Sequence, residues 1–357
     1  MDNIHVACAL DCGMTIPAMI LAYSAKKFAN SHRKTIFHVL ECEKGAFPSY
    51  GDYLLNSEFF EIRHHLVSLN AFEDYDLSIA IVPSLAAFAR LAIPDIISEA
   101  ERVLYLDCDV IINRPIDALF DVDMKGFALA ACRDLMYAYF MHHGEGPPQD
   151  AGKILCQDPD SYFNSGVMLI DCQKWRDAGY FASLIKVLSA PPAPLFMPDQ
   201  DALNIVFKNE HLKLDSKWNV RASRYDLSKD EELEKLIIFC ADDPWIIHFM
   251  GKAKPWIRFH QPTEFHRLYW ALAEESPFLS RLISLYETGP SENTAYALKK
   301  RAISSDRHIW EFLFTLSRAT EKLEHVFRLQ QNLSIRLGTL GKKFYEKYLN
   351  TAEITRS

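Results

Sequence analysis

The stretch LYLDCDV, residues 104–110, places two aspartates one residue apart at the end of an apolar run. Alternate side chains of an extended chain share a face, so we expect Asp107 and Asp109 to point the same way and Cys108 to turn into the protein. Two like charges side by side need a cation, a shared proton or open water. Such triplets are common in surface turns, but an acidic pair inside an apolar segment is costly to keep, which favours a functional role.

A histidine far along the chain could complete a metal site. In IIHFMGKAKPW, residues 246–256, His248 follows an apolar strand as the aspartate pair does, so it can reach the same sheet edge. Two carboxylates and one imidazole suit Mn²⁺ or Mg²⁺, with other positions open to water or phosphate oxygens. Gly251, Lys252 and Lys254 add the close backbone approach and positive charge that a diphosphate needs. The alternative is a structural histidine, which is the commoner role after a strand.

The elements that must position these residues alternate between short apolar runs and helix-like stretches, which is typical of an α/β sheet with crossover helices. The predicted strands are residues 5–10, 35–41, 64–69, 102–107, 127–132, 166–171, 211–215, 236–239 and 245–249. The predicted helices are residues 17–28, 84–97, 173–188, 199–207 and 263–275. Pro17 and Pro198 stand where helices would begin, and the Gly- and Pro-bearing residues 142–153 indicate a loop.

The chain changes character near residue 280, where strands vanish and TGPSEN, residues 288–293, resembles a linker. Beyond it a heptad-like seam of about five repeats is formed by Ile309, Phe312, Leu316, Ala319, Leu323, Val326, Gln330, Leu333, Leu337, Leu340 and Phe344. Residues 299–347 hold eleven Lys/Arg against five Asp/Glu. This basic amphipathic tail either packs on the preceding domain, forms homo-oligomers, or rests on an anionic membrane surface. We therefore predict domains at residues 1–280 and 281–357.

Bulk properties exclude several classes of protein. The net charge of −8 over 357 residues argues against a general nucleic-acid binder. The start, MDNIHVACALDCGM, is acidic where a signal peptide would be basic, and no apolar run approaches the roughly 20 residues of a membrane-spanning helix. The eight cysteines are scattered without a CxxC pair, which indicates reduced, mostly buried side chains. We expect a cytoplasmic protein, with the tail as a candidate for peripheral contact with the inner face of the cytoplasmic membrane.

Three further motifs are AFARL (residues 87–91), YFNSGVMLID (162–171) and PDQDALN (198–204). Together with LYLDCDV and HFMGKAKPW they resemble the signature set of glycosyltransferase family 8, which includes bacterial lipopolysaccharide galactosyl- and glucosyltransferases and glycogenin. The five motifs occur in the family's order, over roughly residues 3–260. The resemblance implies an α/β protein of GT-A fold, with a single Rossmann-like mixed sheet flanked by helices. It also implies transfer of a hexose from a UDP-sugar with retention of configuration.

The resemblance assigns roles to individual residues. Asp107, Asp109 and His248 would bind Mn²⁺, or Mg²⁺, which bridges the donor diphosphate. Lys254 would stabilise the charge that develops on departing UDP, and Gly251 would let its loop close over the diphosphate. The remaining positions assigned to donor binding are Asp11, Arg90, Cys108, Asp134, Asn164 and Ser165. Lys252 occupies a position that is not basic throughout the family.

The catalytic assignments from the resemblance are Asp199 and Gln200, which match positions beside the donor sugar. An amide is a poor nucleophile, so a front-face route, in which the leaving phosphate takes the acceptor's proton, is favoured over a covalent intermediate. Both routes stay open. The sequence departs from the family in its first loop, where LDCG, residues 10–13, replaces the frequent DDNY or DDGY. This chain therefore lacks the first aspartate and the tyrosine of that family motif. Contacts of those two side chains with the base, and strict uridine selectivity, are not predicted for it.

The sequence thus predicts a metal-dependent, retaining hexosyltransferase that moves galactose or glucose from a UDP-sugar to a glycan. The expected acceptor is a lipopolysaccharide core or a related bacterial surface glycan, with a lipid-linked saccharide as one form. Two alternatives are a catalytically inactive nucleotide-sugar-binding protein and a glycogenin-like self-glucosylating protein. A metal-dependent phosphohydrolase is disfavoured, because no HD, HxH or DxDGT-like element accompanies the aspartate pair.

Overall fold

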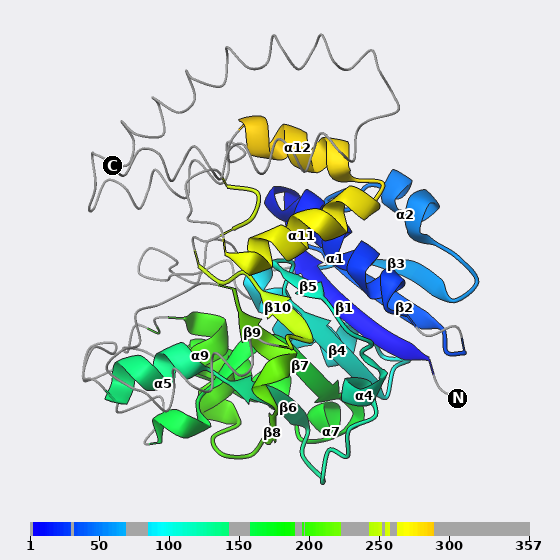
Figure 1. Ribbon diagram of the computed structural model, residues 1–357. Helices are drawn as coiled ribbons and strands as arrows, with labels where there is room; N and C mark the ends of the chain where they lie inside the picture. Colours follow the sequence, from blue (N-terminus) through cyan, green and yellow to red (C-terminus); the bar gives the residue numbers. More distant parts are fainter. Residues whose placement is uncertain are drawn as a thin grey trace, which may run out of the picture. The chain divides into compact units, whose positions relative to one another are not determined.

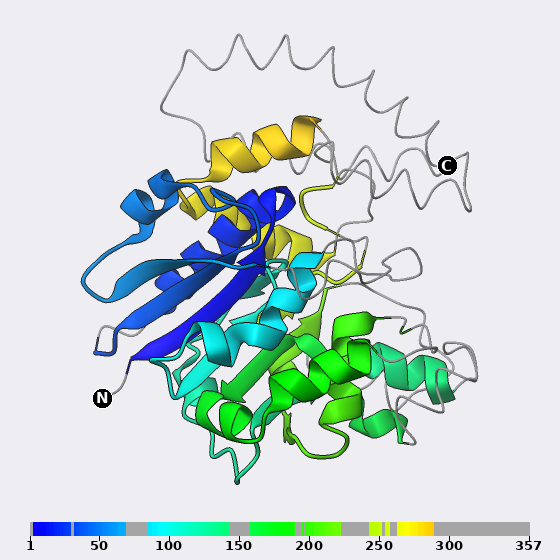
Figure 2. The same cartoon turned by 180° about the vertical axis from the view of Figure 1, so that it is seen from behind.

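Figures 1 and 2 show the computed structural model of the chain from two sides. The structure describes residues 3–29, 32–68, 85–142, 158–189, 195, 197–222, 243–251, 254–257 and 263–288. The chain divides into two compact units, one up to His248 and one from Phe249. The predicted domain boundary at residue 280 stays a prediction. The predicted strand 236–239, most of the predicted loop 142–153 and the basic tail lie outside the described residues.

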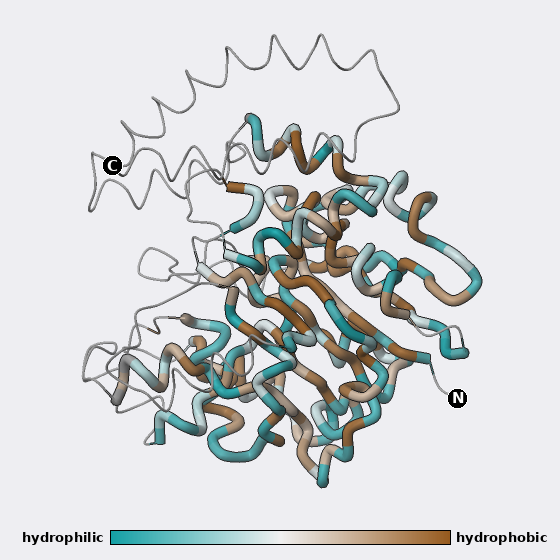
Figure 3. The backbone as a smooth tube through the Cα atoms, in the orientation of Figure 1, coloured by the Kyte–Doolittle hydropathy of each residue, from teal (hydrophilic) through white to brown (hydrophobic). Residues whose placement is uncertain are grey.

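The first unit is built on a seven-stranded mixed sheet in the order β3-β2-β1-β4-β7-β6-β8. Its strands are β1 (Ile4–Leu10), β2 (Thr35–Glu41), β3 (Phe60–Leu66), β4 (Arg102–Leu106), β6 (Leu129–Arg133), β7 (Phe163–Asp171) and β8 (Leu212–Leu214). Strands β3, β2, β1 and β4 are parallel, whereas β7 runs antiparallel to both β4 and β6. Figure 3 shows the apolar character concentrated in these central strands. The predicted α/β class is confirmed.

A second, three-stranded sheet has the order β5-β10-β9, which the sequence patterns did not separate from the first. It consists of β5 (Val110–Ile112), β9 (Val220–Arg221) and β10 (Ile246–His248). Strand β10 is antiparallel to β5, with His248 opposite Val110, and parallel to β9, with His248 opposite Arg221. Since β5 begins directly after the aspartate pair, this register brings His248 beside it.

The helices of the first unit alternate with its strands along the chain. They are α1 (Thr15–Lys27), α2 (Ser49–Leu55), α3 (Ile93–Ile96), α4 (Asp117–Phe120), α5 (Leu135–His142), α7 (Cys172–Asp177), α8 (Tyr180–Leu188) and α9 (Pro198–Val206). Short 3-10 helices are η1 (Cys12–Met14), η4 (Leu85–Ala92), η5 (Pro159–Ser161) and η6 (Ser216–Asn219). The second unit contains α11 (Glu264–Glu275) and α12 (Leu279–Thr288). Among the described helices, none combines the length and apolar character needed to cross a bilayer.

Several predicted element boundaries were wrong for local reasons. The single helix predicted at 173–188 is two helices, because Gly179 takes the left-handed conformation with φ +64°. The helix predicted at 84–97 is mostly 3-10, and Pro17 stands at the third position of α1 rather than at its start. Helices α2, α4, α5 and α12 were not predicted. By contrast, α9 begins at Pro198 as expected.

The main hydrophobic core lies between the sheet and the helices η4, α3 and α7–α9, which stand in front of the strands in Figure 2. Its centre holds Trp175 and Phe207, whose ring centroids are 5.0 Å apart, with Phe88 and Phe163 also fully buried. The six described cysteines are all free, and four of them are buried. Cys12 is the exposed exception, and Cys156 and Cys240 lie outside the described residues.

Three histidines form a ladder across β1, β2 and β3. His5 Nδ1 lies 2.9 Å from His38 Nε2, and His38 Nδ1 lies 2.9 Å from His65 Nε2. Burial lowers the pKa of all three imidazoles, and that of His38 falls from 6.5 to about 3. A base with a lower pKa in the folded state takes up protons on unfolding, so its contribution to stability is lost as the pH falls below 6.5.

We expect the free energy of unfolding to fall between pH 6.5 and pH 3, by up to about 1.4 kcal/mol per pH unit for each proton taken up. The substitution His38→Gln should flatten this dependence, because it removes the most strongly shifted group, while lowering stability at neutral pH. Urea unfolding at several pH values measures both effects. The exposed His32→Gln serves as the control. An unchanged pH dependence in the His38 variant would contradict the ladder's role.

Candidate active site

The aspartate pair lies in the turn that joins β4 to β5. The N–H of Asp107 donates to the carbonyl of Gly166 at 2.8 Å, and that of Val110 donates to the carbonyl of Asp107 at 3.2 Å. His248 Nε2 lies 3.1 Å from Asp109 Oδ1 and 3.6 Å from Asp107 Oδ2. One ligand atom from each of the three residues falls within 4.8 Å of the others. The structure therefore brings together the three residues that the sequence assigned to a metal.

Cys108, between the two aspartates, is turned into the protein as expected. It is buried, and its thiol donates to the carbonyl of Ala9 on β1 at 3.1 Å. The thiol therefore faces away from the carboxylates, and its backbone is the part left for contact with a donor. The two carboxylates share a side because the chain turns at residues 107–109, not because β4 continues through them.

The two oxygens of Asp107 have separate partners. Oδ1 accepts from the Tyr105 hydroxyl at 2.7 Å and pairs with Arg90 Nη2 at 2.8 Å. Oδ2 is the oxygen that faces His248. Tyr105 and Asp107 point the same way because they are two residues apart at the end of β4. Asp107 is thus held by one oxygen and presents the other.

Arg90 is buried at the centre of this arrangement. Its Nη1 lies 3.2 Å from Asp199 Oδ2 and donates to Ser165 Oγ at 2.8 Å. The guanidinium carbon also lies 4.9 Å from the centroid of the Tyr105 ring. Burial lowers the pKa of Arg90, but the charges of Asp107 and Asp199 among others raise it overall, so the guanidinium stays charged. Arg90, assigned from the resemblance to the donor sugar, here links β4 to α9.

A second cluster joins buried amides and a carboxylate on the α9 side of the site. Gln200 Oε1 accepts from the N–H of Ser165 at 3.0 Å, and Gln200 Nε2 donates to Asp134 Oδ2 at 3.1 Å. Asn164 Nδ2 donates to the same two oxygens, at 3.1 and 3.3 Å. Asp134 Oδ1 accepts from the N–H groups of residues 136 and 137 and so caps α5. The predicted donor-binding and catalytic residues of this group therefore do meet.

The three remaining predicted residues are Asp11, Lys254 and Gly251. Asp11 is at the carboxyl end of β1, where its side chain accepts from Gly13 N–H at 2.9 Å and caps η1. Lys254 belongs to the second unit and donates to the carbonyl of Phe249 at 2.6 Å. Gly251, in the same unit, has φ +70°, a conformation that favours glycine. Lys252 lies outside the described residues, and contacts of Gly251 and Lys254 with the metal ligands stay a prediction.

Sequence reasoning missed three residues that shape the site: Tyr105, Gly166 and Asn219. The alternation along β4 could have revealed Tyr105, since it shares a face with Asp107. Gly166 lies within the YFNSG motif, but its role depends on what faces it. Asn219 donates to Asn164 Oδ1 at 2.8 Å, and its own Oδ1 lies 3.0 Å from His248 Nδ1. No local spacing in the sequence indicates these contacts.

Gly166 leaves the space that the imidazole occupies. A Cβ at this position would lie 2.1 Å from His248 Cε1 and 2.8 Å from Asp107 Oδ2. We expect Gly166→Ala to displace His248, to weaken Mn²⁺ binding about 10–100-fold and to cost about 1–3 kcal/mol of stability. Electron paramagnetic resonance of free Mn²⁺ and thermal melts measure the two effects. In the control Gly51→Ala the new Cβ meets Phe47 at 2.6 Å, so stability should fall while Mn²⁺ binding persists. Unchanged Mn²⁺ affinity in Gly166→Ala would refute the steric argument.

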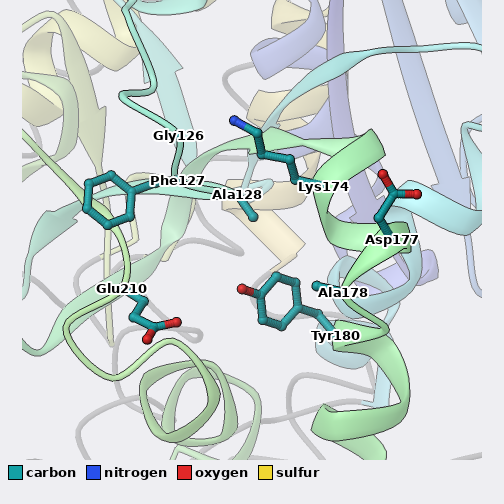
Figure 4. A pocket seen from close by; sticks show the side chains of 8 residues that line it. All are labelled: Gly126, Phe127, Ala128, Lys174, Asp177, Ala178, Tyr180 and Glu210. Atoms are coloured by element: carbon teal, nitrogen blue, oxygen red, sulfur yellow. The ribbon is translucent and has the colours of Figure 1, made fainter.

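A surface hollow of about 610 Å³ lies beside α7 and the start of β6 (Figure 4). Its lining includes Phe127, Lys174, Asp177, Tyr180 and Glu210. Strand β7 ends at this hollow. Because β7 is antiparallel to β4, the hollow lies at the edge of the sheet opposite the aspartate pair. None of the predicted site residues lines it.

Comparison with known proteins agrees with this architecture. The family model for glycosyl transferase family 8 matches residues 29–259, and the chain belongs to that family. General stress protein A of Bacillus subtilis is 31% identical over 48% of this chain and 59% of its own length. Glycosyltransferase GlyF of Streptococcus pneumoniae is 30% identical over 58% of this chain and 46% of its own length. Lipopolysaccharide 1,2-glucosyltransferase of Escherichia coli is 28% identical over 44% of each chain. The chain thus spans about half the length of the curated relatives it matches.

Solved structures share the fold. The apo structure of the bifunctional glycosyltransferase WbbM superposes with a TM-score of 0.67 at 22% identity, covering 81% of this chain and 52% of that one. Galactosyltransferase LgtC, in complex with donor and acceptor sugar analogues, gives 0.57 at 23% identity, covering 77% and 96%. At these identities the likeness concerns the fold, which is GT-A as the sequence predicted.

Proposed function

We propose that this chain is a metal-dependent, retaining hexosyltransferase that moves galactose or glucose from a UDP-sugar to a glycan. The observation that carries the proposal is the cluster of Asp107, Asp109 and His248, joined through Arg90 to the buried Asp199. A member of glycosyl transferase family 8 with these side chains gathered at one sheet edge has the parts that this chemistry needs.

The donor set supports a divalent cation. Two carboxylate oxygens and one imidazole nitrogen suit Mn²⁺, and Mg²⁺ is the alternative because it prefers oxygen ligands. Gly166 leaves the imidazole its space, and Asn219 occupies the other ring nitrogen, so that Nε2 faces the carboxylates. When bound, the ion would supply positive charge against the departing diphosphate.

The chain's own groups would then bind, orient and neutralise. Arg90 compensates the negative charges of Asp107 and Asp199, which would otherwise repel a phosphate. Asn164, Gln200 and Asp134 would present fixed polar atoms to the sugar hydroxyls. Both ends of the Gln200 amide are already hydrogen-bonded, so we infer that Gln200 has a positioning role and does not attack the sugar. We therefore infer a front-face route, in which the acceptor's proton passes to the leaving phosphate.

The remaining assignments belong to the same proposal. Lys254 and Gly251 would contact the diphosphate, while Asp11 and the backbone of Cys108 would lie near the nucleoside. The names of the E. coli lipopolysaccharide glucosyltransferase and of GlyF support an acceptor of the bacterial surface glycan class. We propose a cytoplasmic site of action, with the basic tail providing membrane contact or self-association.

The test is UDP release by the purified full chain from a panel of UDP-hexoses, with Mn²⁺, Mg²⁺ or chelator. We expect chelator-sensitive release from UDP-glucose or UDP-galactose, rising when a saccharide acceptor is added. UDP binding without release from any donor, even with acceptors, would overturn the transferase and favour an inactive binder. A gain of hexose by the protein itself, seen by intact mass, would redirect the proposal to self-glucosylation.

A further inference from the structure

Asn219 links the proposed metal ligand to the amide cluster. It ends η6, directly before β9, whose pairing with β10 sets Arg221 opposite His248. Asn219 Oδ1 lies 3.0 Å from His248 Nδ1, and Asn219 Nδ2 donates to Asn164 Oδ1 at 2.8 Å. Asn164 in turn donates to Gln200 Oε1 at 3.1 Å. A continuous line of hydrogen bonds therefore runs from the imidazole to the α9 side of the site.

The direction of this line is fixed by a backbone group. Asn164 Oδ1 accepts from the N–H of Gly166 at 3.0 Å, and a backbone N–H can only donate. The atom of Asn164 at that position must therefore be oxygen. Asn219 also bonds to Asn164 Oδ1, so the Asn219 side chain must direct its amide nitrogen at that oxygen. The carbonyl oxygen of Asn219 is thereby turned toward His248.

This orientation determines which nitrogen of His248 carries the proton. A carbonyl oxygen can only accept, so Nδ1 must be the protonated nitrogen. Nε2 is then the nitrogen directed at the carboxylates, 3.1 Å from Asp109 Oδ1, and in the neutral imidazole it carries the lone pair that a cation would take. The neighbouring N–H of Ser165 orients Gln200 in the same manner, through Gln200 Oε1 at 3.0 Å. Two successive amide groups of β7 thus orient both branches of the network.

We propose that Asn219 is a positioning residue: it holds His248 with Nε2 directed at the cation site, and it couples His248 to the residues that orient the donor sugar. The inference rests on the proposed function. It assigns two separable tasks to one side chain: its carbonyl oxygen orients the metal ligand, and its amide nitrogen fixes Asn164. Partners that orient the outer nitrogen of a ligating histidine commonly change metal affinity when they are removed.

Two substitutions separate the tasks. Asn219→Ala removes both hydrogen bonds, so we expect Mn²⁺ affinity to fall about 10–100-fold. Asn219→Asp keeps an acceptor for His248 Nδ1 but opposes Asn164 Oδ1 with a second acceptor. We expect its Mn²⁺ affinity to stay within about twofold of wild type or to tighten, while the KM for the UDP-sugar rises about tenfold or more.

The measurement is titration of the full-length protein with Mn²⁺ alone, followed by electron paramagnetic resonance, with circular dichroism to establish folding. The matched control is Asn113→Ala. It removes a 2.8 Å hydrogen bond from the Asn113 side-chain amide to the Pro244 carbonyl, beside the same small sheet, and should leave Mn²⁺ affinity unchanged. If the wild type binds Mn²⁺ and Asn219→Ala binds it with equal affinity, this inference is overturned while the proposed metal site stands. Should that variant not fold, a tenfold loss of Mn²⁺ affinity in Asn219→Asp would also overturn it. Absence of Mn²⁺ binding by the wild type would overturn the proposed metal site together with this inference.

Discussion

Replacing Asp109 by asparagine is expected to abolish most metal-dependent donor turnover while leaving the fold intact. Asp109 Oδ1 is the carboxylate oxygen nearest to His248 Nε2, at 3.1 Å, and its side chain is 14% exposed. An amide oxygen is a neutral and weaker ligand, so we expect UDP release with Mn²⁺ to fall about 10²–10³-fold. Stability should change little or rise slightly, because a repulsion between two neighbouring carboxylates is relieved.

Substitution of Asp109 tests the proposed metal site more specifically than substitution of Asp107. Asp107 also pairs with Arg90 and accepts from Tyr105, so its substitution would disturb that ion pair as well as the proposed metal site. The measurements are Mn²⁺ affinity and UDP release with and without chelator. The control is Asp177→Asn, the same chemical change at the hollow on the opposite edge of the sheet. An Asp109→Asn protein that kept a third of wild-type turnover, with the same chelator sensitivity, would refute the role of Asp109 as a ligand.

The clustering of the three proposed metal ligands could be predicted because their signal is local. Asp107 and Asp109 end an apolar run, and His248 ends another, so the tendency of ligands to bind at the carboxyl edge of a sheet was enough to place them together. Their exact neighbours could not be predicted in this way. The pairing of β5 with β10, which sets Val110 opposite His248, joins segments more than 130 residues apart and includes strands of three residues.

The contacts of Arg90 and Asn219 lay beyond sequence reasoning for a different reason. The assignment of Arg90 to donor binding stays a prediction, but its burial among Asp107, Ser165 and Asp199 follows from the packing of η4 against the sheet and α9. Asn219 stands in a short 3-10 turn with no periodicity, and its two partners come from β7 and β10. Hydrogen-bond networks of this kind depend on three elements meeting, which no single stretch of sequence encodes.

The substitution Arg90→Met is expected to produce the largest loss of stability. It removes the positive charge that lies 2.8 Å from the partly buried Asp107 and 3.2 Å from the buried Asp199, and so leaves both carboxylates uncompensated. Breaking a buried ion pair on one side typically costs about 3–5 kcal/mol. The matched control is Arg33→Met. Arg33 binds Asp121 through two bonds of 2.7 and 2.8 Å, but Asp121 is 58% exposed, so the loss should stay near or below about 1 kcal/mol.

The pH dependence distinguishes a lost ion pair from lost packing. Burial raises the pKa of Asp199 above 3.8, and Arg90 opposes that rise, so the pKa should climb further when Arg90 is absent. A carboxyl group with a raised pKa in the folded state binds a proton on folding, which makes its protein gain stability as the pH falls through that pKa. The deficit of Arg90→Met relative to wild type should therefore shrink as the pH falls from neutral toward 3.8. Urea unfolding of the wild type and of Arg90→Met, at neutral and at acidic pH, measures this deficit. A deficit in the free energy of unfolding that is equal at the two pH values would not depend on charge, and would mean that Arg90 stabilises the fold through packing.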